Sequence, residues 1–125
     1  MGTAIRAEIS QKNKYWITKH RHYELKHFCL QYPDWKKTHS DLRDTIAPMS
    51  ISKRVTMRAM YAQNIELIEK TARATDPYLY DYIIKGVTEG RSYTYMRTVL
   101  NIPCGKDMYY DRYRKFFWLL SESRK

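Results

Sequence analysis

Apolar residues recur every three or four positions along most of this chain, and this spacing most constrains the fold that it can adopt. The two clearest runs, one near each end, are Leu25, Phe28, Cys29 and Tyr32, and Tyr109, Tyr113, Phe116, Phe117 and Leu120. Such spacing places side chains on one face of an α-helix, whereas a half-buried strand requires strict alternation. The few β-branched residues are also scattered at helical spacing. The sequence therefore predicts an all-α fold of five or six helices.

Proline, glycine and capping residues divide this pattern into segments. Ser52, Asp76 and Ser92 are the expected N-caps, Pro77 suits a first helical position, and Gly90 suits a left-handed C-terminal cap. The expected helices cover residues 15–32, a short stretch from 34 toward 44, and residues 53–74, 77–90, 92–101 and 106–123. In the first of them, a second stripe predicts burial on another side; its residues are Trp16, His20, Tyr23, His27 and Leu30.

The segment from Ile46 to Ser52 is the clearest hinge or linker. We divide the chain there into a basic N-terminal helical region, residues 1–47, and a helical domain, residues 48–125. Residues 1–14 are polar and are expected to form a loose arm or a frayed first turn. Met57, Met60 and Tyr61 either fill the core or form a dimer face.

The charge of the chain indicates the class of partner. Lys and Arg outnumber Asp and Glu by 23 to 13, a net charge of +10, and residues 1–60 carry +7 of it. This excess favours a polyanion, with nucleic acid first and an anionic membrane surface second. No apolar run approaches 18 residues, and the two cysteines are far apart. We expect a cytoplasmic protein without a membrane span.

Residues 92–121 have the layout of a helix-turn-helix unit: a short helix, a tight turn from Ile102 to Gly105, and a longer helix. Ile102 is the apolar residue expected to fill the angle between the helices. The remaining positions of the long helix are polar or long enough to reach phosphates and base edges. The same layout also occurs in small helical domains that bind nothing. Asp107 and Asp111 fit either cytosine contacts or pairing with Arg114 and Lys115.

The stretch "SYTYMRTVLNIPCGKDMYYDRYRKFFWLLSE" resembles the C-terminal end of phage transcriptional regulators of the ArpU/RinA kind. Ile102-Pro103 matches their turn, and Tyr109-Tyr110 matches their aromatic pair. The matching basic run is Arg112, Arg114 and Lys115. The C-terminal part of that family is similar to the helix-turn-helix of sigma-factor region 4. The family usually has a serine soon after Ile-Pro, whereas this chain has Cys104 and Gly105, so the start of the second helix is uncertain by a residue or two.

The resemblance implies a sequence-specific regulator of phage or prophage genes that binds double-stranded DNA in the bacterial host cytoplasm. The expected base contacts are Lys106, Asp107, Tyr110 and Asp111, and the expected phosphate contacts are Arg97, Arg112, Arg114 and Lys115. Host RNA polymerase and a second copy of the chain, in a homodimer, are the expected protein partners. Two alternatives stay open: a DNA-binding subunit like a small terminase, and a protein-binding inhibitor or anti-repressor that does not bind DNA.

We expect neither an enzyme nor a cofactor. The sequence has no glycine-rich phosphate loop, no paired-carboxylate motif and no nucleophile elbow. A zinc site would have to combine His20, His22, His27 or Cys29 with the distant Cys104 or His39, and packed or solvated side chains explain these residues more simply. A helix N-terminus near Cys104 would lower the pKa of its thiol.

Overall fold

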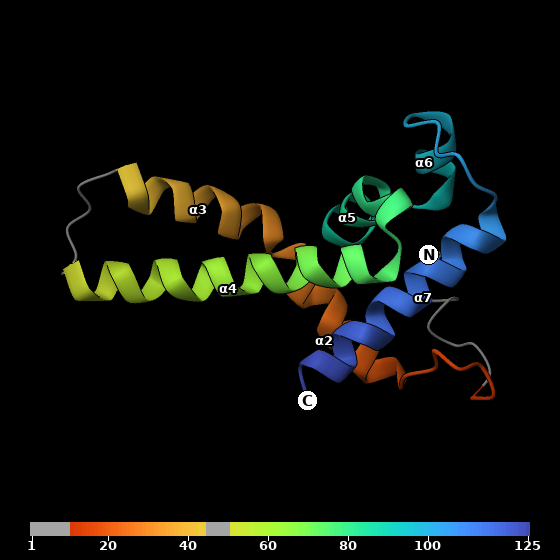
Figure 1. Ribbon diagram of the computed structural model, residues 1–125, viewed down its shortest axis with the longest axis horizontal. Helices are drawn as coiled ribbons and strands as arrows, with labels where there is room; N and C mark the ends of the chain where they lie inside the picture. The colour runs from red at the N-terminus through yellow and green to blue at the C-terminus, as the bar shows by residue number, and fades with distance from the viewer. Residues whose placement is uncertain (1–10, 45–50) are drawn as a thin grey trace.

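The computed structural model describes residues 11–44 and 51–125, and over these residues it is built from helices without strands (Figure 1). The all-α prediction is confirmed. In chain order the elements are α2 (Lys19–Leu30), α3 (Tyr32–Asp44), α4 (Ile51–Thr75), a 3-10 helix η1 (Pro77–Leu79), α5 (Tyr80–Glu89), α6 (Tyr93–Thr98) and α7 (Lys106–Ser123). None of the helices among the described residues has the length and apolar character that a membrane span requires.

The helices form two regions that share α4, the longest of them (Figure 1). We call α3 and residues 51–64 of α4 the arm, since these two antiparallel segments extend together away from the other helices. We call α2, residues 65–75 of α4, η1, α5, α6 and α7 the body. In the body, α7 contacts α2, α4, α5 and α6, so it is the central helix.

The hydrophobic core lies around α7. Leu25 and Cys29 of α2 and Ile68 of α4 are fully buried there, together with Phe116 and Leu120 of α7 itself. Side chains from the N-terminal region and from the C-terminal helix therefore belong to one core. The predicted division at residue 47 does not separate two cores.

Several predicted boundaries are confirmed. Asp76 caps η1, with its carboxylate accepting from the backbone amides of Tyr78 and Leu79, and Ser92 caps α6. Gly90 ends α5 in the left-handed conformation at φ 67°, which glycine adopts without steric cost. The last helix has the predicted bounds, from Lys106 to Ser123.

The predicted start of the first helix is wrong. It begins at Lys19 rather than Tyr15, because the Thr18 hydroxyl accepts from the backbone amide of Arg21 at 3.2 Å and caps the helix. Tyr32 then begins α3 after a single intervening residue, since a proline at the second position costs no helical hydrogen bond.

The predicted cap of α4 is also wrong. This helix begins at Ile51, so Ser52 lies inside it rather than at its N-terminus. Residues 46–50 of the predicted hinge fall outside the described part of the chain, and its last two residues are helical.

The second stripe predicted on the first helix is only half-buried. His20 and His27 are exposed, and His22 is buried instead, with 3% of its surface accessible. The imidazole of His22 packs edge-on against the ring of Phe117, with 4.9 Å between ring centroids. Its Nε2 atom has no hydrogen-bond partner among the described residues. Burial, with a smaller contribution from Lys26, lowers the pKa of His22 from 6.5 to about 4.

Arg21 joins α2 to the C-terminal end of α7. Its guanidinium donates to the backbone carbonyls of Ser121 at 3.0 Å and Arg124 at 2.9 Å, and to the Ser121 hydroxyl at 3.0 Å. These carbonyls belong to the negative end of the helix dipole, where a cation is stabilising. The far end of α7 is therefore fixed in the body, which leaves its N-terminal end as the part that projects.

Candidate nucleic-acid interface

The turn between α6 and α7 is closed by its own backbone. Asn101 adopts φ 54°, a left-handed conformation that asparagine tolerates better than most residues. The next amide, that of Ile102, donates to the carbonyl of Met96 at 3.0 Å. The Ile102 side chain is buried at 3% exposure beside the fully buried Met96, as expected for the apolar residue of such a turn. Ile102 thus fixes α6 against the start of α7.

Tyrosines anchor this turn to the body. The Tyr93 hydroxyl donates to the carbonyl of Cys104 at 2.8 Å, and the hydroxyl of Tyr110 accepts from the Tyr93 amide at 3.3 Å. Tyr110 is buried, with 6% of its surface exposed, so the prediction that it faces base edges is wrong. It lies three residues before Tyr113 and seven before Phe117, and this spacing turns all three side chains toward the core.

A close approach of α5 fixes the neighbouring turn of α7. A Cβ atom added to Gly86 would overlap the hydroxyl of Tyr109, so only glycine fits there without a shift. Tyr109 is itself buried, and its hydroxyl donates to the carbonyl of Arg91 at 3.4 Å. The second turn of α7 is therefore packed on two sides, whereas residues 106–108 of its first turn are open to solvent.

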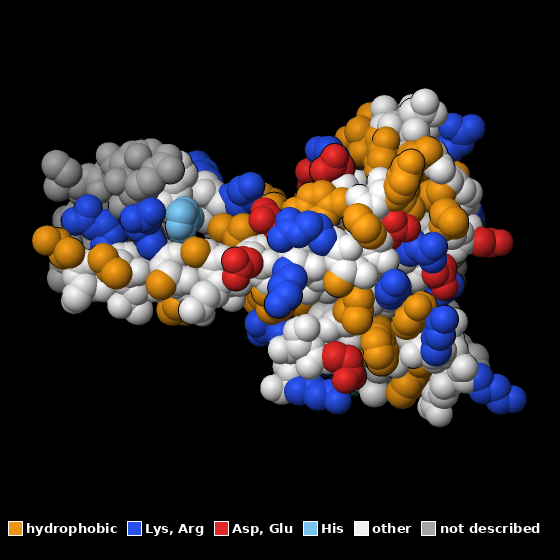
Figure 2. All heavy atoms as spheres, in the orientation of Figure 1, with side chains coloured by type: hydrophobic (Ala, Val, Ile, Leu, Met, Phe, Trp, Pro, Cys, Tyr) orange, Lys and Arg blue, Asp and Glu red, His pale blue; other side chains and the backbone are white. Residues whose placement is uncertain are grey.

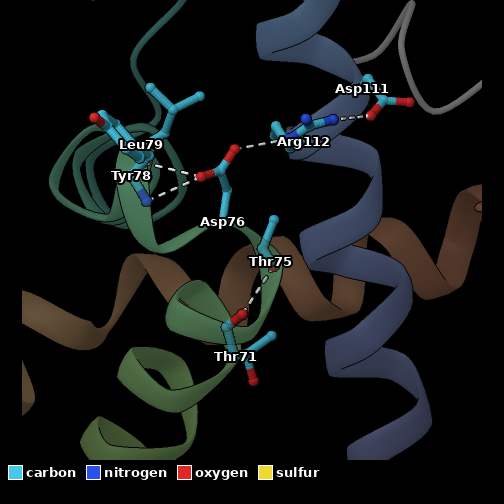
Figure 3. Close-up of polar contacts among 7 residues, drawn as sticks. All are labelled: Thr71, Thr75, Asp76, Tyr78, Leu79, Asp111 and Arg112. Atoms are coloured by element: carbon cyan, nitrogen blue, oxygen red, sulfur yellow. Dashed lines mark hydrogen bonds and ion pairs between the residues drawn. The ribbon is translucent and has the colours of Figure 1, made fainter.

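Arg112 is engaged within the body rather than presented to a ligand (Figure 3). Its Nε atom donates to Asp76 Oδ2 at 2.9 Å, and its Nη1 atom donates to Asp111 Oδ2 at 2.5 Å. Partial burial raises the pKa of Asp76, but hydrogen bonds from Arg112 and from two backbone amides outweigh it, so the net pKa is lowered. The predicted phosphate contact through Arg112 is corrected to an ion pair that joins α7 to the cap of η1. Asp111 is occupied by the same guanidinium.

The remaining predicted residues are at least partly exposed. Lys106 and Asp107 are exposed, Arg114 and Lys115 are half-exposed, and Arg97 is exposed on α6, where its guanidinium donates to Asn101 at 3.0 Å. The structure thus brings the N-terminus of α7 and Arg97 to the same turn. A hollow of about 460 Å³ lies there, lined by Tyr93, Arg97, Asn101, Ile102, Pro103, Cys104 and Gly105.

Met108 also belongs to this surface. Its side chain is 47% exposed, and it lies on the same side of α7 as Asp111 and Lys115, three and seven residues further on. The buried stripe begins at the next residue, Tyr109. A helical projection of α7 centred on its buried residues would have placed Met108 outside.

The surface is only weakly basic. Arg97, Lys106, Arg114 and Lys115 contribute four positive charges, and Asp107 and Asp111 contribute two negative charges. Much of the net charge of +10 therefore lies elsewhere, and the arm carries a share of it. This surface is suited to reading a few groups with both donors and acceptors, and less to holding a long run of phosphates.

Metal and thiol chemistry find little support in the described residues. No three His, Cys, Asp or Glu side chains within 11–44 and 51–125 are grouped as metal ligands. Cys29 is buried and Cys104 is half-buried, and both are free thiols. Burial raises the pKa of the Cys104 thiol, so the prediction that the start of α7 lowers it is wrong.

Comparison with known proteins gives no further guide to this surface, since no family model, no curated protein and no solved structure matches the chain.

Proposed function

We propose that the chain is a sequence-specific regulator of phage or prophage genes that binds double-stranded DNA with the first turn of α7. The observation that carries this proposal is that residues 106–108, at the N-terminus of α7, are all exposed, while the buried stripe that anchors the helix in the core begins at Tyr109. A recognition helix of the helix-turn-helix class reads base edges mainly with its N-terminal residues. The arrangement of α6, the Ile102 turn and α7 supports the same assignment.

The proposed contacts are fewer than the sequence alone suggested. Lys106 and Asp107 are exposed on the projecting turn and are assigned to base edges. Arg97 on α6, and Arg114 and Lys115 about two turns further along α7, are assigned to phosphates. The assignment to phage genes, and contact with host RNA polymerase in the cytoplasm, rest on the resemblance to regulators of the ArpU/RinA kind.

The test is binding to the DNA upstream of the gene and to a scrambled duplex of equal length, measured by fluorescence anisotropy over a salt series. We expect the specific signal to survive at about 150 mM salt, with a log–log slope that corresponds to several phosphate contacts. Weak and equal binding to both duplexes that vanishes with salt would mean that the net charge only attracts a polyanion. No binding even at low salt would favour a protein-binding inhibitor.

A pair of double variants locates the interface. Lys106→Ala/Arg114→Ala removes two positive charges from the proposed surface, and Lys70→Ala/Lys85→Ala removes two from exposed positions on α4 and α5. We expect the first to weaken specific binding about tenfold or more and the second to have a small effect. Equal losses from two folded variants would contradict the assignment of this surface, and circular dichroism checks that both are folded.

A further inference from the structure

The face of α4 turned away from α3 exposes large apolar side chains. Ile51 is 75% exposed, Val55 59% and Met60 54%, and these are three of the six large hydrophobic residues that are exposed in the described part of the chain. Figure 2 shows hydrophobic side chains spaced along this part of α4, beside Lys and Arg. Ile51 and Val55 lie on one side of this face together with the exposed Ala59 and Ala62, whereas Met60, nine residues after Ile51, lies at its opposite edge.

This face carries no charge over four turns. The residues between 51 and 63 that point away from α3 are Ile51, Ser52, Val55, Thr56, Ala59, Met60, Ala62 and Gln63, which we call the outer strip. Lys53 and Arg58 lie at its edges, and Glu66 is the first charged residue that continues it. An uncharged strip of this length stands out in a chain with a net charge of +10.

The charge distribution identifies the occupant. An acidic protein or a nucleic acid would be attracted to the basic surfaces, and the strip offers it cations only at its edges, through Lys53 and Arg58. Two copies of this chain repel each other through their net charge wherever charged faces meet. The outer strip is a place where two copies can touch without placing like charges opposite each other.

The shape of the strip also suits another helix. Ile51, Val55, Ala59 and Ala62 follow one another at spacings of four, four and three residues, which form a continuous ridge along a helix. The small side chains of Ala59 and Ala62 allow a partner helix to approach closely, and Ile51 and Val55 supply the larger apolar groups of the ridge. Such a ridge packs against the grooves of a second helix of the same kind.

We infer that the outer strip of α4 is a self-association surface, on which two copies of the chain pair through the same face about a two-fold axis. A strip of 13 residues is about 20 Å long, which is short for a stable dimer. We therefore expect a weak dimer that forms as the protein concentration rises. The proposed DNA surface on α7 is not involved, so the two proposals stand or fall separately.

The experiment measures the molar mass of the protein without DNA, by sedimentation velocity over a concentration series. Val55→Glu places a charge in the middle of the strip, and Val99→Glu places the same charge on a valine of almost equal exposure, 60% against 59%, next to α6. We expect the wild type and Val99→Glu to be monomers at about 1 μM and mainly dimers at several hundred μM, whereas Val55→Glu stays monomeric throughout. Ala59→Glu, also exposed on the strip, serves as the second strip variant.

Three outcomes would overturn the inference. One is a wild type that stays monomeric at several hundred μM, and another is a dimer that persists in both strip variants. The third is growth beyond two copies, because a surface that pairs with itself about a two-fold axis closes at the dimer. Circular dichroism establishes that the variants keep their helices, so a loss of the dimer is not a loss of the fold.

Discussion

The arm and the body are both helical, but they are held together in different ways. In the body, α7 alone buries three tyrosines and two phenylalanines, and rings from α2 and α6 pack against them. In the arm, none of the described residues 36–41 and 51–64 is buried, and α3 and α4 cover each other only in part. Tyr32 and Trp35 are the exceptions at the base of α3, where Trp35 is buried against Phe28 of α2 with 4.9 Å between ring centroids.

This difference shows that helical periodicity and burial are separate properties of a sequence. The stripe of Met57, Tyr61 and Ile65 has the same spacing as that of Tyr109, Tyr113 and Phe117, yet its members are only half-buried. Two helices can cover one side of each other, whereas a central helix needs neighbours on several sides. We therefore expect substitutions in the body to affect global unfolding and substitutions in the arm to affect local opening.

The largest expected effect comes from truncating the core of the body. Phe116→Ala removes a fully buried ring from α7, and we expect it to lower the free energy of unfolding by about 3–5 kcal/mol. Ile51→Ala removes a side chain of the arm that is 75% exposed, with an expected change within about 0.5 kcal/mol. Urea denaturation followed by circular dichroism measures both values. Similar losses from the two substitutions would show that the arm is as tightly packed as the body.

Acid should weaken the body through His22. Its pKa is lowered from 6.5 to about 4 in the folded state, so between these values the unfolded chain binds more protons than the folded one. Stability therefore falls as the pH falls from about 6.5 to about 4, by about 3 kcal/mol in all. His22→Phe, which keeps a ring against Phe117, should remove most of this slope, as measured by urea denaturation at a series of pH values.

The control is His27→Gln on the same helix, where the side chain is exposed. We expect this variant to keep the dependence on pH of the wild type. Asp76 acts at lower pH, because its lowered carboxyl pKa gives stability that is lost only when the carboxylate is protonated. If the free energy of unfolding of His22→Phe still falls between pH 6.5 and pH 4, the imidazole of His22 is solvated in the folded protein.

Local signals in the sequence predicted much of this fold. Asp76, Ser92 and Gly90 determine where helices begin and end through their own backbone contacts, so neighbouring residues suffice to identify them. The burial of His22 rather than His20 depends on where α7 lies against α2, which no spacing within α2 specifies. The same holds for the Arg112–Asp76 pair, whose members are 36 residues apart. The exposed Arg97, Lys106 and Asp107 of the candidate surface were predicted, whereas the exposure of Met108 and the burial of Tyr110 were not, because buried and exposed residues follow one another along the same helix.

The smallest expected effect distinguishes local from global opening. Ala59→Gly places a flexible residue on the exposed side of α4 in the arm, and Lys85→Gly does so on the exposed side of α5 in the body. Each substitution costs about 1 kcal/mol in helix propensity. If the arm opens by itself, Ala59→Gly speeds hydrogen exchange of arm amides about fivefold and leaves the body amides and the urea midpoint unchanged. Lys85→Gly should instead lower the urea midpoint.

The midpoints of both variants are measured at low protein concentration, where the chain is monomeric. A lower urea midpoint for Ala59→Gly would mean that the arm and the body unfold as one cooperative unit.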